Sequence, residues 1–178
     1  LIIAHPSWEV PYNWHENTIM GNTCLYGATG GMLLGAGQAG ERFAVRNSGA
    51  TAVVEGVGDH ACEYMTAGTI VCLGETGRNF GAGMSGGVAF IYDPLNQLSA
   101  NLNPEMVFLE RLDDNEEIDS LRQVIDLHRK MTGSRRAGSI LENWEEALGA
   151  FQRVSPFTAP DVARSVFHFD RAPFIPAV

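Results

Sequence analysis

The sequence predicts a mainly β fold: a right-handed parallel β-helix with rungs of about 19 residues, followed by a C-terminal helical arm and an extended tail. Glycine is concentrated in one stretch, since 17 of the 20 glycines lie between Gly21 and Gly87. Within that stretch glycine recurs at spacings of 19, 19 and 18 residues. Beyond it, the periodicity becomes helical. The recurring glycines are Gly30, Gly49, Gly68 and Gly86.

Each recurring glycine follows a small residue and precedes a short apolar run. Runs of this length are typical of strands and too short for amphipathic helices. Glycine tolerates a positive φ at a tight corner because it has no Cβ. We therefore expect the four recurring glycines to be structural corners. The apolar runs that follow them are Met32–Leu34, Ala52–Val54, Ile70–Leu73 and Val88–Ile91.

Composition divides the chain near residue 93. Residues 1–93 hold 8 acidic and 3 basic residues, whereas residues 94–178 hold 13 and 9. We expect a glycine-rich β-helix domain over 1–93 and a helical arm and tail over 94–178.

The second part contains recognisable helix signals. Met106–Leu109 is a possible short strand. Asp114 and Glu117 have the spacing of a capping box, which predicts a helix that begins there and ends at Gly133. A second helix is expected over Ile140–Leu148, and Ser155–Val178 is expected to be an extended tail that lies on another surface.

Charge and hydropathy exclude several classes of protein. With 12 Lys and Arg against 21 Asp and Glu, the chain offers no positive field for nucleic acid. No apolar run approaches the ~20 residues that span a bilayer, and the first residues do not resemble a signal peptide. Three cysteines suit a reducing compartment. These features predict a cytoplasmic location.

The cysteines are expected to be free, buried thiols. Cys24, Phe43, Cys62 and Phe80 each lie six residues before a recurring glycine. Cys24 and Cys62 would therefore be two rungs apart, roughly 9–10 Å, which is too far for a disulfide.

No active site is evident in the sequence. Gly35–Gly40 has G-x-G-x-x-G spacing, but a β-like segment follows it rather than the helix that dinucleotide binding needs. The same spacing returns at Gly81–Gly86, so repeated corners explain both. Asp59, His60 and Glu63 are metal-ligand types, but they fall between rungs, where polar turn residues are expected. We therefore expect no catalytic, cofactor-binding or metal-binding residue.

Several segments resemble one family. Asn17–Gly31, Ala39–Ala50, Cys62–Thr66 and Asn79–Gly87 are similar to the C-terminal glycine-rich (GXGXG-type) repeat domain of the glutamate synthase large subunit. The segment from His128 to Trp144 is similar to the C-terminus of the same subunit.

The resemblance implies a structural spacer within a larger oxidoreductase. In that family, a glutaminase domain releases ammonia, which reacts with 2-oxoglutarate at a synthase domain holding FMN and an iron–sulfur cluster. Electrons come from ferredoxin, or from a pyridine nucleotide through a small reductase subunit. The implied partners are therefore the glutaminase and FMN-binding synthase domains, with no cofactor in this chain.

A second possibility is a free-standing β-helix subunit of another redox complex, such as the glycine-rich subunit of formylmethanofuran dehydrogenase. The helical arm favours the glutamate synthase domain over a free-standing subunit. Because Leu1 opens inside an apolar β-like run, we expect a fragment of a longer polypeptide that lacks at least one N-terminal rung. Without that rung, the first strand would have an unpaired edge, which predicts self-association or capping by another chain.

Overall fold

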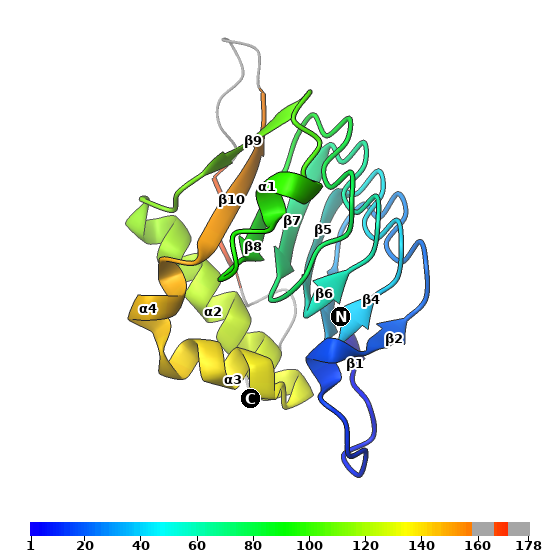
Figure 1. Ribbon diagram of the computed structural model, residues 1–178, viewed down its shortest axis with the longest axis vertical. Helices are drawn as coiled ribbons and strands as arrows, with labels where there is room; N and C mark the ends of the chain where they lie inside the picture. The colour runs from blue at the N-terminus through cyan, green and yellow to red at the C-terminus, as the bar shows by residue number, and fades with distance from the viewer. Residues whose placement is uncertain (158–165, 171–178) are drawn as a thin grey trace.

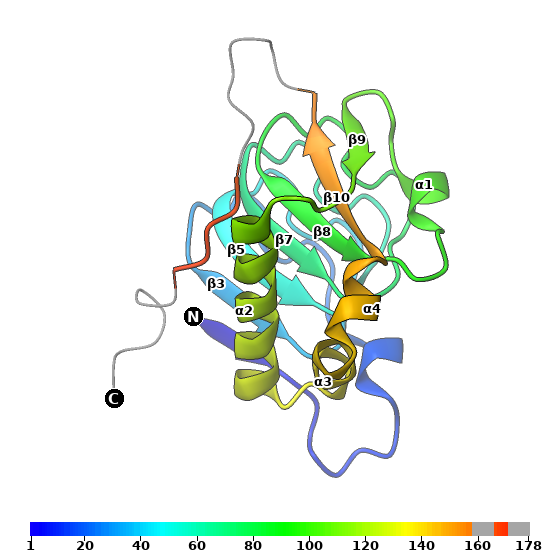
Figure 2. The same ribbon diagram turned by 90° about the vertical axis from the view of Figure 1, so that its left-hand side faces the viewer.

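The structure, a computed structural model, describes residues 1–157 and 166–170 and is mainly β (Figures 1 and 2). Its strands are β1 (Ile2–Ala4), β2 (Thr18–Met20), β3 (Met32–Gly35), β4 (Gln38–Ala39), β5 (Ser48–Val54), β6 (Gly56–Val57), β7 (Ala67–Cys72), β8 (Val88–Tyr92), β9 (Val107–Glu110) and β10 (Phe151–Pro156). Its helices are the 3-10 helix η1 (Trp14–Glu16), α1 (Leu98–Asn101), α2 (Asn115–Thr132), α3 (Arg135–Glu142) and α4 (Trp144–Leu148).

Parallel strands from successive rungs stack into a solenoid. The main sheet runs in the order β1-β3-β5-β7-β8, and each neighbouring pair is parallel. Leu33 pairs with Ala52, Ala52 with Ile70, and Ile70 with Ala89, so three successive rungs are 19, 18 and 19 residues long. A smaller parallel sheet, β2-β4-β6, forms another side. The predicted parallel β-solenoid is confirmed.

Both faces of the main sheet are buried at its inner strands, which explains the unbroken apolar runs of β3, β7 and β8. Leu33 and Ile70 belong to the core inside the solenoid, together with Phe43 of a turn segment. Their strand neighbours Leu34 and Val71 belong to a second core, between the sheet and the helices. Alternate residues of one strand therefore fill two different cores.

The turn segments of the rungs also stack on one another. In each segment, every second residue has a positive φ: Thr23, Leu25 and Gly27, then Arg42, Ala44 and Arg46, then His60, Cys62 and Tyr64, then Asn79, Gly81 and Gly83. Left-handed backbone costs roughly 1–2 kcal/mol for a residue with a side chain. Hydrogen bonds between rungs accompany it, as from Arg42 N to Asp59 O at 2.8 Å and from Ala44 N to Cys24 O at 2.9 Å. This alternation of left-handed residues was not predicted from the sequence.

Cys62 lies one position away from the place that the glycine spacing predicts. Its N–H donates to Phe43 O, and Gly81 N donates to Ala61 O. Ala61 rather than Cys62 is therefore stacked with Phe43. The reason is the 18-residue rung between β5 and β7, in which the residue of positive φ at His60 follows Arg42 by 18 positions.

The C-terminal part extends the main sheet. Strand β10 pairs antiparallel with β8, and β9 pairs antiparallel with β10, so these strands continue the solenoid sheet across residue 93. Figure 2 shows α2 lying across the sheet, with α3 and α4 beside it. The expected strand at Met106–Leu109 is β9, shifted by one residue. Strand β10 begins where no strand was predicted, and it takes in the first two residues of the expected tail.

Helix α2 begins and ends where the sequence predicts. The Asp114 side chain accepts hydrogen bonds from Glu116 N and Glu117 N, and Gly133 ends the helix with a φ of 71°. The expected second helix is two helices, α3 and α4, interrupted at Asn143. In the part of the chain that the structure describes, no helix combines the length and the apolar character needed to cross a membrane.

Candidate functional site

The four predicted corner glycines occupy different local environments. Gly68 has a φ of +92°, whereas Gly30, Gly49 and Gly86 have no positive φ. A Cβ on Gly49 would lie 2.5 Å from Thr29 O of the preceding rung, and a Cβ on Gly86 would clash with Thr66 O in the same way. A Cβ on Gly30 would meet no atom within 4 Å.

Asp59, His60 and Glu63 lie at the surface of the turn stack. The Asp59 carboxylate accepts from Arg78 Nη2 at 2.8 Å and from Arg78 N at 2.8 Å. These hydrogen bonds lower the pKa of Asp59 below its ordinary value. His60 Nδ1 lies 2.7 Å from Glu63 Oε1. In the described ranges, no group of three His, Cys, Asp or Glu side chains is arranged to hold a metal ion.

The G-x-G-x-x-G segment contains strand ends. Gly35 ends β3, Gln38 and Ala39 form β4, and the residues that follow are turns rather than a helix. The helix N-terminus that would face a pyrophosphate in a dinucleotide site is therefore missing from Gly35–Asn47, all of which the structure describes.

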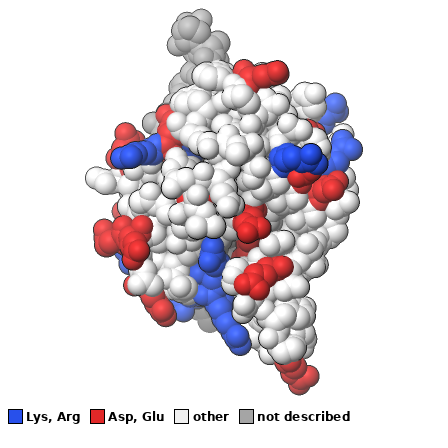
Figure 3. All heavy atoms as spheres, viewed as in Figure 1, with Lys and Arg blue, Asp and Glu red and all other residues white. Residues whose placement is uncertain are grey.

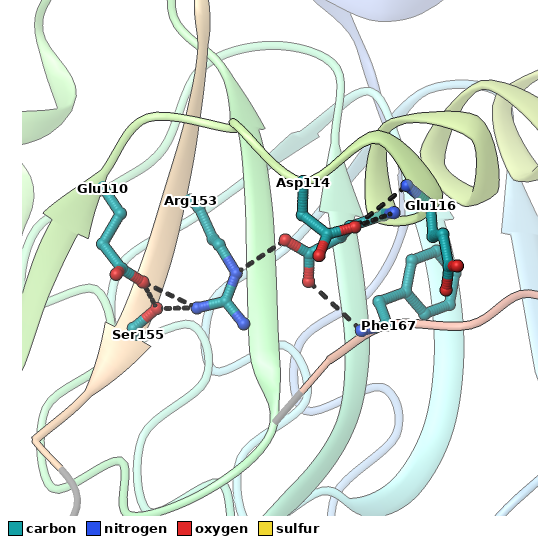
Figure 4. Close-up of polar contacts among 7 residues, drawn as sticks. Glu110, Asp114, Glu116, Arg153, Ser155 and Phe167 are labelled. Carbon is teal, nitrogen blue, oxygen red and sulfur yellow. Dashed lines mark hydrogen bonds and ion pairs between the residues drawn. The ribbon is translucent and has the colours of Figure 1, made fainter. Parts of the chain in front are cut away.

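A group of charged side chains surrounds Arg153 in β10 (Figure 4). Arg153 is 1% exposed. Its Nε donates to Glu117 Oε2 of α2 at 3.0 Å, and its Nη1 donates to Glu110 Oε2 of β9 at 2.8 Å. Ser155 accepts from Arg153 Nη1 and donates to Glu110. One arginine thus joins two strands and the first long helix.

Glu117 also binds the segment that follows β10 in sequence. Its Oε1 accepts from Phe167 N at 3.1 Å. The Phe167 ring is 6% exposed and lies 5.8 Å from the ring of Phe90, centroid to centroid. The expected tail therefore packs on the solenoid at Phe167; residues 158–165 and 171–178 lie outside the described residues.

A second buried cluster joins the solenoid to the start of α3. Glu55 directly follows β5 and is 1% exposed. Its Oε1 accepts from Ser134 Oγ and lies 3.4 Å from His128 Nε2. Ser134 is also the N-cap of α3, because its Oγ accepts from Ala137 N at 2.9 Å. His128 Nδ1 has no hydrogen-bond partner among the described residues.

The cysteines are free, as predicted. Cys62 and Cys72 are fully buried, and Cys24 is partly exposed. Burial raises the pKa of Cys72 to about 12 and raises that of Cys62 further. Both thiols are therefore protonated near neutral pH, which is unlike a nucleophilic cysteine.

The two buried clusters have a structural role: they stabilise the packing of the helices against the solenoid sheet. Within each cluster the acidic groups bind basic or hydroxyl groups inside the fold, and each cluster connects the solenoid sheet with the helices. Sequence reasoning missed Glu55 and Arg153. The available signal was a charged residue within or directly after a run of buried strand residues, since such a residue needs a partner.

Comparisons with known proteins point to one family. Residues 1–157 match the GXGXG motif family. The chain is 48% identical over 161 residues to ferredoxin-dependent glutamate synthase 2 of Synechocystis sp., covering 90% of this chain and 10% of that protein. It is 52% identical over 155 residues to the NADH glutamate synthase of Schizosaccharomyces pombe, covering 87% of this chain and 7% of that protein.

A similar relationship holds for a chloroplastic protein. The ferredoxin-dependent glutamate synthase of Spinacia oleracea is 44% identical over 170 residues, covering 96% of this chain and 10% of that protein. The chain spans about a tenth or less of the length of these relatives. The resemblance inferred from the residues is confirmed.

Proposed function

Because the chain belongs to the GXGXG motif family and is similar to about a tenth of several glutamate synthases, we propose that it is a non-catalytic structural domain of a glutamate synthase. The observation that carries the proposal is 48% to 52% identity across nine tenths of this chain. The buried clusters around Arg153 and Glu55 support it, because their hydrogen bonds join the sheet of the solenoid to the helices.

In this proposal, glutamate synthesis belongs to the whole enzyme. The glutaminase and FMN-binding synthase domains would be the neighbours of this chain, and FMN and an iron–sulfur cluster would be held outside it. Electrons would come from ferredoxin or through a small reductase subunit. We expect the parent enzyme in the cytoplasm, and cell fractionation tests this because some of the similar proteins are named chloroplastic.

The first experiment is the denatured mass of the native polypeptide, detected with an antibody to this chain. We expect a band many times the 19.3 kDa of the chain. A band near that mass would overturn the proposal and favour a free-standing subunit.

The second experiment tests the absence of catalysis. The chain is incubated with glutamine, 2-oxoglutarate and a reduced electron donor, and glutamate is measured. We expect the blank rate, while the full-length parent enzyme turns over in the same assay. Turnover by the chain alone would show that it carries an active site.

We also propose that the chain self-associates through β1 when it is isolated. Strand β1 lies at the edge of the main sheet and pairs only with β3 among the described strands. Leu1, Ile2 and Ile3 are 48%, 57% and 40% exposed. An apolar edge with free backbone groups pairs readily with another chain. Light scattering should show oligomers that Ile2→Lys disperses; a monomer at high concentration contradicts this.

A further inference from the structure

One segment after β10 is docked on the domain without joining either sheet. It is Val166–Asp170, which we call the strap, and it belongs to none of the strands in the part of the chain that the structure describes. Figure 2 shows the strap in red beside α2, on the side away from α3. The GXGXG family match covers residues 1–157, so the strap lies outside it. The strap is therefore an addition to the matched domain rather than one of its rungs.

The strap contacts the domain through every second residue. Phe167 is 6% exposed and Phe169 is partly buried. Val166, His168 and Asp170 are exposed. A period of two is typical of extended backbone that lies with one face on a surface. The strap thus presents two phenylalanine side chains to the domain and the other side chains to solvent.

The surface that receives the strap combines apolar side chains with one carboxylate. We call it the strap site: Phe90, Glu117 and the core between the main sheet and the helices, on which both strap rings pack. The Phe167 ring lies 5.8 Å from the ring of Phe90 and 6.4 Å from that of Phe169, centroid to centroid. Glu117 Oε1 accepts from Phe167 N at 3.1 Å (Figure 4). An occupant therefore needs extended backbone, an N–H directed at Glu117, and two aromatic side chains separated by one residue.

The two oxygens of Glu117 bind different parts of the structure. Oε2 accepts from Arg153 Nε, and Oε1 accepts from Phe167 N. Release of the strap leaves the ion pair between Glu117 and Arg153 in place, so it does not strand a buried charge. Oε1 is hydrated once the strap has left, which offsets the lost hydrogen bond. The domain can therefore release the strap and keep the contact that joins β10 to α2.

The strap site selects its occupant by aromatic contact and main-chain geometry rather than by surface charge. On the face drawn in Figure 3, Lys and Arg atoms are interspersed with Asp and Glu atoms, so charge of one sign marks no docking surface there. Aromatic side chains bury large areas and contribute strongly to interfaces, while a main-chain hydrogen bond fixes the direction of a bound peptide. His168, between the two phenylalanines, is exposed, and its Nδ1 lies 3.9 Å from Glu116 Oε2. The pattern that the site recognises is therefore Phe-x-Phe.

We propose that the strap site is a docking site for an extended Phe-x-Phe segment, and that the chain's own strap occupies it reversibly. Another segment with the same pattern takes the place of the strap when the strap is released. The strap has the advantage of its covalent connection, since a short connection gives a tethered ligand an effective concentration of about 1 mM or more. The site lies within the chain itself, so it does not depend on which parent enzyme contains the chain.

Hydrogen exchange of the intact chain, followed by NMR, tests whether the strap is released reversibly. We expect the Phe167 amide to exchange about a hundredfold faster than the amides of β8. Low urea concentrations should leave its rate unchanged, because local opening exposes little surface. Equal protection of Phe167 and β8 would make the strap part of the global fold and overturn the proposal. A Phe167 amide that exchanges as in an unfolded peptide would show that the strap is not docked, and would overturn it as well.

Titration with a synthetic peptide tests whether the site accepts an occupant in trans. A peptide of residues 164–171 is added, up to about 1 mM, to the Phe167→Ala chain, whose own strap lacks its buried ring. Amide shifts of β8 and α2 should saturate. The affinity of the unaltered chain for the peptide should be at least about tenfold weaker, because the tethered strap competes. A peptide with Val166→Ala, at an exposed strap position, should bind equally well, and a peptide with Phe167→Ala should not bind.

Four results of the titration would overturn the proposal. The first is the absence of shifts in the Phe167→Ala chain, and the second is binding that the Phe167→Ala peptide retains. The third is equal affinity for the altered and unaltered chains, which would place the peptide outside the strap site. The fourth is global unfolding of the Phe167→Ala chain, seen as loss of the β8 signals, which would show that the fold requires the strap.

Discussion

Arg153 of β10 and Glu117 of α2 form a buried ion pair, with Nε 3.0 Å from Oε2 and both side chains at most 2% exposed. The two residues are 36 positions apart, and the pair fixes the last described strand against the first long helix. Burying two charged side chains has a large desolvation cost. The fold is therefore stable only if the two groups stay hydrogen-bonded to each other.

Arg153→Met should therefore lower the free energy of unfolding by about 3–5 kcal/mol, because it takes the arginine charge away from the buried Glu117 carboxylate and from the partly exposed Glu110 carboxylate. Urea unfolding followed by circular dichroism measures the loss. Arg111→Met, at an exposed arginine, should change the stability by less than about 0.5 kcal/mol. A loss for Arg153→Met below about 1 kcal/mol would show that the pair contributes little.

Gly49→Ala should destabilise the solenoid by about 1–3 kcal/mol, since the new Cβ would lie 2.5 Å from Thr29 O and push two rungs apart. Gly30→Ala is the matched control, because its Cβ meets no atom within 4 Å and its φ is not positive. That variant should be neutral or slightly more stable, through the less flexible unfolded chain. Equal melting temperatures for the two variants would refute the role of Gly49 as a close-approach corner.

The solenoid could be predicted from sequence because its signal repeats. The glycine spacing and the apolar runs recur in every rung, and the 19-residue period fixes which strands become neighbours. The exact position of each residue within a rung is harder to predict from the sequence. A single missing residue between Arg42 and His60 shifts Cys62 by one position, and the alignment on glycines alone does not reveal it.

The antiparallel end of the sheet could not be predicted in the same way. β10 occurs once, has no repeat to identify it, and carries the polar residues Gln152, Arg153 and Ser155 among its apolar ones. Its partners β8 and β9 are distant in sequence, so only tertiary contacts select this pairing. The buried clusters are similar: Glu117 looks like a local capping residue, whereas its carboxylate binds Arg153 and Phe167 N.

Ser134→Ala should lower the free energy of unfolding by about 2–4 kcal/mol. The change removes the N-cap hydrogen bond to Ala137 N, typically about 1 kcal/mol, and deprives buried Glu55 of a donor, roughly 1–3 kcal/mol more. Ser139→Ala lies on the same helix at an exposed position and should be nearly neutral. If the two alanine variants unfold at the same urea concentration, Ser134 does not join α3 to the solenoid.

The two buried thiols should make the fold less stable in alkali. Burial raises the pKa of Cys72 to about 12 and that of Cys62 further, whereas an unfolded thiol has a pKa near 8.5. The unfolded state therefore releases protons first, and the free energy of unfolding falls as pH rises above about 8.5. The contribution is fully present below that pH, and each thiol accounts for a loss of about 2 kcal/mol by pH 10.

Substituting Cys62 and Cys72 together by alanine isolates this effect, because lysine and tyrosine titrations are shared with the parent chain. Both chains are unfolded with urea at pH 7, 8, 9 and 10. The double variant should lose less stability than the parent between pH 8 and pH 10, and Cys24→Ala, at the partly exposed cysteine, should follow the parent. Parallel pH profiles for the parent and the double variant would mean that the buried thiols ionise without unfolding, which the closed core around them opposes.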